Sequence, residues 1–367
     1  MRPMVQRREV VVGGLMAGAA AALPPGRVES AVEAPAPAET KRGAQRLSLE
    51  QLREWESLAY GIFLHFGMST FDGTEISDGR APATLYAPDA LDVDQWVAVA
   101  RDAGMKYAVL TAKHVAGHCL WPSRHTAYTV ANSTERTDVC ERFVEACRKR
   151  GVLPGFYYCS WDNHNRFGSR TPSDEGFEWG NWAGVPAEGQ PLAPFTTSVY
   201  QNFQTLQLTE LLTQYGPIAE TWIDIPGVLG PGYREFLYRH VATLQPETVV
   251  MMNNGLGDGE SYDAAYAWPS DLIAIERALP PESGHRRWRR IGGRDHYLPG
   301  EVCDPIGKKW FHVDGDAPRP DGTLLGLLQA SRARGANLLL DVPPDRHGRI
   351  PEASVQALMR LRRNARL

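Results

Sequence analysis

Short apolar runs and amphipathic segments alternate along the chain from about Leu47 onward. The apolar runs are rich in β-branched and aromatic residues and are bounded by Gly, Pro or Asp, which is typical of buried β-strands. This pattern predicts seven strands, over residues 61–67, 107–114, 153–160, 218–224, 248–253, 271–277 and 337–344.

Segments with helical spacing of apolar residues lie between these strands. In residues 197–215, for example, Leu208, Leu211, Leu212 and Tyr215 fall on one helical face. The pattern predicts helices over residues 91–105, 137–151, 197–215 and 323–335, and one more helix that closes the chain.

The repeated strand–helix alternation determines the expected fold class. Strands that are apolar along their whole length require a parallel sheet covered on both faces. An eighth strand fits into the less regular residues 285–315, and no GxGxxG or GxxxxGK[ST] motif follows the first strand. We therefore expect an α/β protein with one (β/α)₈ TIM-like barrel domain over residues 45–367, rather than an open nucleotide-binding sheet.

The first 44 residues have a different composition from the rest. An arginine pair, Arg7-Arg8, precedes an apolar stretch from Val10 to Leu23 that is rich in Gly and Ala, and helix-breaking prolines follow. This order is typical of a twin-arginine export signal. The rest of this segment, up to residue 44, is predicted to be a disordered lead-in. We expect a periplasmic or extracellular protein, with an uncleaved membrane anchor as the competing interpretation.

Charge and cysteine content restrict the class of partner. The net charge is −4 with 22% charged residues, so no basic surface for nucleic acid or an anionic membrane is indicated. Ten Trp and thirteen Tyr suit the binding of neutral sugars, although core packing explains most of them. The five cysteines form no CxxC pair, so neither a zinc ribbon nor a required disulfide is indicated.

Polar side chains stand where the predicted strands end, which is where the active sites of such barrels lie. They are His65, Lys113 with His114, Tyr157 and Tyr158 with Trp161, Asp224, Asn253 with Asn254, and Glu276. Strand alternation places Glu220, Trp222 and Asp224 on one face, so we expect Asp224 to face the mouth of the barrel.

Two histidines four residues apart, His114 and His118, raise the question of a metal site. Both imidazoles would share a face only on a helix, but His114 ends a strand and Gly117 interrupts the segment that follows. His114 is better explained as a neutral group that binds hydroxyls. His118 and Trp121 lie on the adjoining loop, where an ordinary structural role for His118 is an equal alternative.

Six segments taken in order carry a family resemblance: GIFLHFGMSTF, KYAVLTAKHVAGHCLWPS, GFYYCSW, TWID, PGEVCDPIGKKWF and GANLLLDVPPDRHGRIPE. Together they resemble glycoside hydrolase family 29, the α-L-fucosidases, from about Trp55 to the C-terminus. The resemblance implies a (β/α)₈-like catalytic domain, a retaining mechanism without a metal or other cofactor, and a fucosylated oligosaccharide or glycoconjugate as substrate.

The resemblance also implies roles for individual residues. Asp224 matches the nucleophile, while His65 and His114 match histidines that hold sugar hydroxyls. A tyrosine of GFYYCSW belongs near the same sugar, and we favour Tyr158 over Tyr157. Glu276 is the first choice for the acid/base and Glu301 the second. The remaining candidates, all for the substrate-binding wall or loop, are His118, Trp121, Trp161 and Trp222.

Departures from the family pattern leave alternatives open. Val115 replaces the second histidine of the family's Lys-His-His motif, His118 replaces a Phe, and no C-terminal β-sandwich is expected. One alternative is a metal-dependent hydrolase that uses His65, His114 and His118. Another is an inactive fucose-binding barrel. We also expect loops 68–90 and 161–195 to influence which leaving group is accepted.

Overall fold

The structure, a computed structural model, describes residues 43–165 and 198–367. The chain divides into two units, residues 1–41 and 42–367, and every described residue belongs to the second unit. The expected export signal therefore lies outside the described residues, as does most of the loop expected over residues 161–195.

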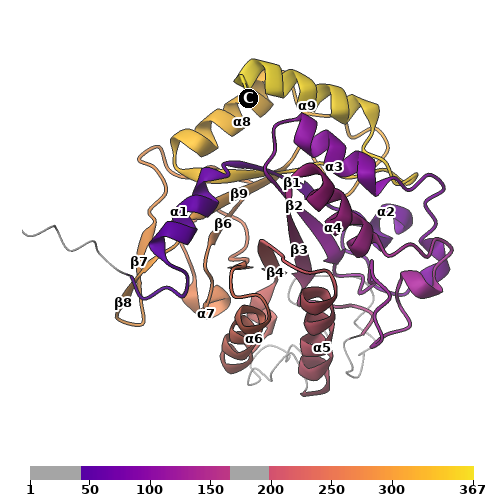
Figure 1. The fold of residues 1–367 in the computed structure, drawn as a ribbon, viewed down its shortest axis with the longest axis horizontal. Helices are drawn as coiled ribbons and strands as arrows, with labels where there is room; N and C mark the ends of the chain where they lie inside the picture. Colours follow the sequence, from indigo (N-terminus) through magenta and orange to yellow (C-terminus); the bar gives the residue numbers. More distant parts are fainter. Residues whose placement is uncertain (1–42, 166–197) are drawn as a thin grey trace, which may run out of the picture. The chain divides into compact units, whose positions relative to one another are not determined.

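Eight parallel strands form one sheet in the order β5-β4-β3-β2-β1-β10-β9-β6 (Figure 1). The two end strands approach each other, because the backbone N–H of Asp271 donates to the carbonyl of Val250 at 2.8 Å. The sheet is therefore a nearly closed barrel, which confirms the predicted fold class. Its strands are β1 (Tyr60–Leu64), β2 (Tyr107–Lys113), β3 (Leu153–Cys159), β4 (Glu220–Asp224), β5 (Val249–Met252), β6 (Ile273–Glu276), β9 (Gly300–Pro305) and β10 (Ala336–Asp341).

All seven predicted strands are present, with bounds that differ by a few residues. The eighth, β9, lies inside the irregular region 285–315, as expected. That region also contains an antiparallel hairpin that the sequence pattern did not predict, formed by β7 (Trp288–Ile291) and β8 (Arg294–Tyr297). Its alternation is hidden because arginines occupy many of its positions.

The helices lie around the outside of the strands (Figure 1). The four helices with predicted ranges are confirmed as α3, α4, α5 and α8, and the closing helix as α9. An unpredicted helix, α6, has a faint pattern because only Arg234, Leu237 and Val241 are buried on it. The described helices are α1 (Leu49–Ser57), α2 (Met68–Asp72), α3 (Val93–Asp102), α4 (Val139–Arg150), α5 (Ser198–Gln214), α6 (Pro231–Leu244), α7 (Ala264–Ala267), α8 (Asp321–Ala333) and α9 (Glu352–Ala365).

Local sequence signals explain where α3 and α4 begin and end. Asp92 accepts a hydrogen bond from the backbone N–H of Gln95, and Asp138 accepts one from that of Glu141. Each carboxylate satisfies a donor that has no partner inside the helix and lies at the positive end of the helix dipole. Helix α4 ends at Gly151, whose φ of 66° suits glycine.

The core has two layers, because alternate residues of each strand face opposite sides of the sheet. One layer lies between the strands and the helices and includes Ile62, Leu110 and Phe156. The other fills the barrel and includes Phe63, Tyr157 and Trp222.

Two further features of the described chain bear on the expectations. All five cysteines are buried, and none is bonded to another. No helix among the described residues has the length and apolar character needed to cross a bilayer.

Candidate active site

The carboxyl ends of the strands surround a cavity of about 590 Å³. Five of the predicted site residues line it: His65 after β1, His114 after β2, Trp222 and Asp224 on β4, and Glu276 on β6. The barrel thus brings together residues that are far apart in the sequence.

Asp224 is the last residue of β4, and three donors hold its carboxylate. Oδ2 accepts from the Tyr157 hydroxyl at 2.6 Å, and Oδ1 accepts from Asn253 Nδ2 at 2.8 Å. Oδ1 also accepts from the backbone N–H of Ile225 at 2.9 Å. Ile225 adopts a left-handed conformation with φ of 49°, which turns the chain sharply after Asp224. Together the three donors stabilise a negative charge on this carboxylate.

Glu276 is the last residue of β6, and its Oε2 accepts from Asn253 Nδ2 at 3.0 Å. Burial raises the pKa of Glu276 to about 7, and the negative charge of Asp224 contributes to the increase. The next residue, Arg277, again has a left-handed φ, of 52°. Backbone strain of this kind costs on the order of 1–3 kcal/mol and is common at functional sites.

Asn253, the first residue after β5, bridges the two carboxyl groups. The two N–H bonds of an amide nitrogen diverge at roughly 120°, so bonds of 2.8 and 3.0 Å place the two acceptor oxygens about 5 Å apart. One carboxyl group is held by three donors and the other has a raised pKa. The two groups are therefore suited to opposite protonation states near neutral pH.

The two predicted histidines lie side by side at the wall of the cavity, with ring centroids 5.8 Å apart. Burial, and then the neighbouring His65, lower the pKa of His114 well below its usual value, so this imidazole is neutral at pH 7. Its Nδ1 is buried without a hydrogen-bond partner. His114 stacks on the ring of Tyr157 at 5.5 Å.

Aromatic rings form the apolar part of the cavity. Trp222 stacks on Tyr157 at 5.4 Å and packs against Phe63 at 5.5 Å. Near Glu276, the Arg277 guanidinium lies 4.8 Å from the ring centroid of Trp310. This arrangement offers a flat hydrophobic wall beside the two carboxyl groups.

The structure brings Tyr157, and not the favoured Tyr158, to the cavity. Tyr157 faces the barrel, lines the cavity and donates to Asp224. Tyr158 faces the opposite side of β3, where its hydroxyl accepts from Lys113 Nζ at 2.8 Å and donates to Gln207 at 2.8 Å. Since neighbouring residues of a strand point to opposite faces, only one of the two tyrosines can reach the site.

Three other predicted binding residues are buried away from the cavity. His118 is hydrogen-bonded to Ser133 at 2.8 Å, and burial lowers its pKa to about 3. Trp121 donates to Glu210 of α5 at 2.9 Å, and Trp161 donates to Asn163 at 2.7 Å. His118 Nε2 and the indole N–H groups of Trp121 and Trp161 thus have protein partners, and none of the three residues lines the cavity in the described part of the chain.

Glu301, the second choice for the acid/base, lies deep inside the barrel and is 1% exposed. It is near the start of β9, whereas active-site groups occupy strand ends. Its oxygens accept from the Tyr107 hydroxyl at 2.7 Å and from Trp222 Nε1 at 3.0 Å. The geometry places Glu276, and not Glu301, at the cavity.

The sequence interpretation gave no role to several residues that the structure brings to the site. Asn253 had been noticed only as a polar residue at a strand end, and Trp310 and Arg277 not as binding residues. Asp341, at the end of β10, lies within hydrogen-bonding distance of His65. Its position after an apolar strand was the one signal that could have identified it.

The metal-site alternative requires three histidines around one point. His65 and His114 are neighbours, but the ring of His118 stacks on Tyr86 instead. Across residues 43–165 and 198–367, no group of three His, Cys, Asp or Glu side chains is arranged to hold a metal ion.

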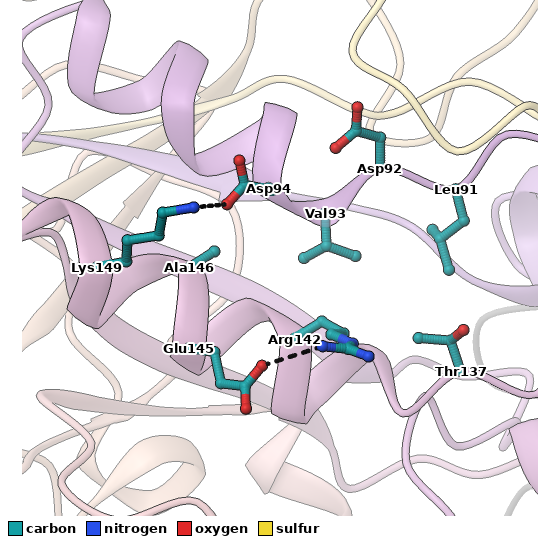
Figure 2. Close-up of a pocket in the computed structure, with 9 residues that line it drawn as sticks. All are labelled: Leu91, Asp92, Val93, Asp94, Thr137, Arg142, Glu145, Ala146 and Lys149. Carbon is teal, nitrogen blue, oxygen red and sulfur yellow. Dashed lines mark hydrogen bonds and ion pairs between the residues drawn. The ribbon is translucent and has the colours of Figure 1, made fainter.

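A second concave surface, of about 390 Å³, is formed by α3, α4 and the segments before them (Figure 2). Four of its charged side chains form two ion pairs, Lys149 with Asp94 at 3.6 Å and Arg142 with Glu145 at 3.4 Å, and Asp94 is also bonded to Arg150. These four side chains are exposed, and none of them lines the cavity at the strand ends. This surface is therefore separate from the candidate active site.

Comparison with known proteins gives a consistent result. A family profile described as Alpha-L-fucosidase matches residues 80–363. Alpha-L-fucosidase 1 from Arabidopsis thaliana is 29% identical over 326 residues, which is 85% of this chain and 59% of that protein. The chain thus spans little more than half the length of this relative.

Solved structures give the same picture. Alpha-L-fucosidase isoenzyme 1 from Paenibacillus thiaminolyticus superimposes with a TM-score of 0.69 at 26% identity, over 86% of this chain and 75% of that one. The fucosidase AlfC from Lactobacillus casei shares the fold, with a TM-score of 0.65 at 21% identity over 86% of this chain and 98% of that one. The fold, the site at the strand ends and the matching profile establish that this chain belongs to the α-L-fucosidase family, glycoside hydrolase family 29.

Proposed function

We propose that this chain is a retaining exo-α-L-fucosidase that releases terminal α-L-fucosyl residues from fucosylated oligosaccharides or glycoconjugates. The observation that carries the proposal is the pair of carboxyl groups bridged by Asn253. Their separation of about 5 Å fits the 5–5.5 Å typical of retaining glycosidases, whereas inverting enzymes need roughly 6.5–9.5 Å for a water molecule.

In the first step, the Asp224 carboxylate attacks C1 of the fucosyl residue while protonated Glu276 donates its proton to the leaving oxygen. A C1–Oδ bond forms as the glycosidic bond breaks, and the aglycone leaves as an alcohol. The raised pKa of Glu276 keeps a fraction of it protonated at pH 7.

In the second step, the Glu276 carboxylate takes a proton from water, and the resulting hydroxide attacks C1. The ester bond to Asp224 breaks, so Asp224 returns to its carboxylate and Glu276 to its acid form. The product keeps its original anomeric configuration because C1 is inverted twice.

The other cavity residues bind and orient the sugar. Neutral His114 and the neighbouring His65 are placed to bond its hydroxyls. The rings of Trp222 and Phe63 offer an apolar surface for the C6 methyl group of a deoxysugar. Asn253 and Tyr157 hold the nucleophile.

Azide rescue tests the two assignments. For Glu276→Ala on an activated aryl fucoside, azide should restore turnover and give a fucosyl azide of retained configuration. For Asp224→Ala, any azide product should be inverted, because azide then attacks the substrate directly.

Glu301→Ala is the control and should show no rescue. Rescue of Glu301→Ala alone would transfer the acid/base role to Glu301. Binding of L-fucose without any turnover would indicate an inactive relative.

We further propose that residues 1–44 direct export through the twin-arginine route, so that the enzyme meets its substrate outside the cytoplasm. The support is the Arg7-Arg8 pair followed by a short apolar stretch. Replacing both arginines with lysine should leave the protein in the cytoplasmic fraction, with the unaltered chain as control. Unchanged fractionation would contradict this route.

A further inference from the structure

The imidazole of His65 is anchored by a buried carboxylate from the end of β10. His65 Nδ1 lies 2.9 Å from Asp341 Oδ1, and the backbone N–H of His65 donates to the same oxygen at 3.3 Å. Asp341 is completely buried, and its other oxygen, Oδ2, has no hydrogen-bond partner. The carboxylate therefore has one specific contact inside the barrel wall, and that contact is His65.

The orientation of the His65 ring is fixed by packing. Phe63 lies 4.4 Å away, Trp310 lies 5.1 Å away and Phe311 lies 5.3 Å away, measured between ring centroids. With Nδ1 turned to Asp341, the opposite edge of the ring carries Nε2. Because His65 lines the cavity, Nε2 is the ring nitrogen available to a sugar hydroxyl.

The protonation state of Asp341 and His65 decides whether Nε2 of His65 accepts or donates a hydrogen bond. When Asp341 is ionised and His65 is neutral, the ring proton sits on Nδ1 and Nε2 carries a lone pair. If the pair gains a proton on the imidazole, both ring nitrogens carry hydrogen. If the proton goes to the carboxyl group, that group donates to Nδ1 and the ring proton moves to Nε2. Either location turns Nε2 into a donor.

We propose that Asp341 is a positioning residue that sets the hydrogen-bonding role of His65 Nε2 toward the sugar, as an acceptor at neutral pH and as a donor once the pair has bound a proton. The inference rests on the proposed function for the identity of the sugar. The acceptor state is the productive one, because Nε2 then accepts a hydrogen bond from a sugar hydroxyl, and this bond is lost in either protonated form.

The surroundings of Asp341 bring this proton uptake into a range of pH that can be measured. Burial raises the pKa of Asp341 to about 6, against the opposing effects of His65 and Arg277. The other titratable or charged groups that line the same cavity are Glu75, His114, Tyr157, Asp224, Tyr266, Glu276, Arg277 and Cys303. The variants below leave all of them unchanged.

Asp341→Asn removes the negative charge of this side chain but keeps its shape. The backbone N–H of His65 still needs an acceptor, so the amide should present its oxygen to His65 and its NH₂ where Oδ2 now has no partner. His65 then keeps its proton on Nδ1 but loses the negative charge that favours the imidazolium. Asp271→Asn is the matched control, because Asp271 is equally buried but pairs with Arg46 outside this cavity.

Imidazole ¹⁵N NMR tests the proposal without any sugar. In the unaltered protein at pH 7.5, His65 should show a protonated Nδ1 and an unprotonated Nε2, and Nε2 should gain a proton when Asp341, whose pKa is about 6, titrates. The transition should move down by at least about one pH unit in Asp341→Asn and stay in place in Asp271→Asn. A protonated Nε2 at pH 7.5, or an unmoved transition in Asp341→Asn, would overturn the inference even if other variants fail to fold.

L-fucose binding by calorimetry provides the second measurement. The Kd of the unaltered protein should rise below pH 6, by up to about tenfold per pH unit, while that of Asp341→Asn should stay flat over the same range. Equal slopes in both proteins would refute the role of Asp341 although the proposed function stands. Failure of the unaltered protein to bind L-fucose at any pH would instead refute the proposed function and this role with it.

Discussion

Asp224 and Glu276 accept hydrogen bonds from the same nitrogen, Asn253 Nδ2, although they lie at the ends of different strands. The shared donor fixes the separation of the two carboxyl groups. It also lowers the pKa of Glu276, against the stronger effect of burial.

Asn253→Ala should therefore change both rate and pH dependence. Loss of a hydrogen bond to a charged group costs about 1.5–3 kcal/mol, so kcat/KM should fall by roughly tenfold to a hundredfold. Without this donor the pKa of Glu276 rises, and the alkaline limb of the kcat/KM profile, near pH 7, should move to higher pH. Asn254→Ala is the control, since Asn254 does not line the cavity. An unmoved alkaline limb in Asn253→Ala would contradict Glu276 as the acid.

The two adjacent tyrosines should respond differently to removal of the hydroxyl. Tyr157→Phe removes a donor to Asp224, the proposed nucleophile, so kcat/KM should fall by about tenfold or more with little loss of stability. Tyr158→Phe removes a partner of buried Lys113, so it should lower the unfolding free energy by about 1–3 kcal/mol. Steady-state kinetics and chemical denaturation of both variants would decide, and the reverse pattern would restore Tyr158 to the site.

The acidic pair inside the barrel should make stability depend on pH. Glu220 and Glu301 are each 1% exposed, and neither oxygen of Glu220 is paired with a donor group. Burial raises the pKa of both, and the neighbouring carboxyl group adds to the effect on Glu220. The folded state thus binds more protons than the unfolded chain above pH 4.3, the ordinary value for glutamate, so stability should fall as the pH rises toward 7 and beyond.

Glu220→Gln removes this penalty and should raise the free energy of unfolding at pH 8 relative to pH 5. The gain is about 1.4 kcal/mol for each unit of pKa shift that is eliminated. Glu210→Gln is the contrasting control, since Glu210 accepts from Trp121 and from the backbone of Arg124. Denaturation curves at the two pH values provide the measurement. Equal effects of Glu220→Gln at both pH values would mean that the pKa of Glu220 is not raised in the folded protein.

A fully buried ion pair supports the segment after β3. Lys113 Nζ lies 2.7 Å from Asp162 Oδ2, and Asp162 Oδ1 accepts from the backbone N–H groups of His164 and Asn165. Lys113→Met leaves the buried Asp162 carboxylate without a counter-charge and should cost about 3–5 kcal/mol of stability. The double variant with Asp162→Asn should recover part of that loss in thermal or chemical unfolding. No recovery would show that the charge is not the cause.

The strands were predictable because parallel strands are buried on both faces and so appear as continuous apolar runs. Tyr157 could not be chosen over Tyr158 in the same way. Tyr157 pairs in register with Trp222, and that pairing joins residues 65 positions apart. Alternation along the strand predicts that the two tyrosines face opposite sides of the sheet. Only the long-range pairing of Tyr157 with Trp222 shows which side is the barrel interior.

The two glutamates illustrate the same difficulty. Glu276 ends its strand, whereas Glu301 is the second residue of β9, in a region where no strand bounds could be read from the sequence. A polar residue in an apolar segment gives the same signal in either position. The loop residues His118 and Trp121 are similar, because their partners Ser133 and Glu210 are known only once the chain is folded.

The most direct test of the proposed mechanism is to trap the glycosyl-enzyme with a 2-fluoro fucosyl reagent and to locate the label by peptide mass spectrometry. The account predicts one added 2-fluorofucosyl group on Asp224, in step with loss of activity. Labelling of another residue, or product formation with no label at all, would contradict it.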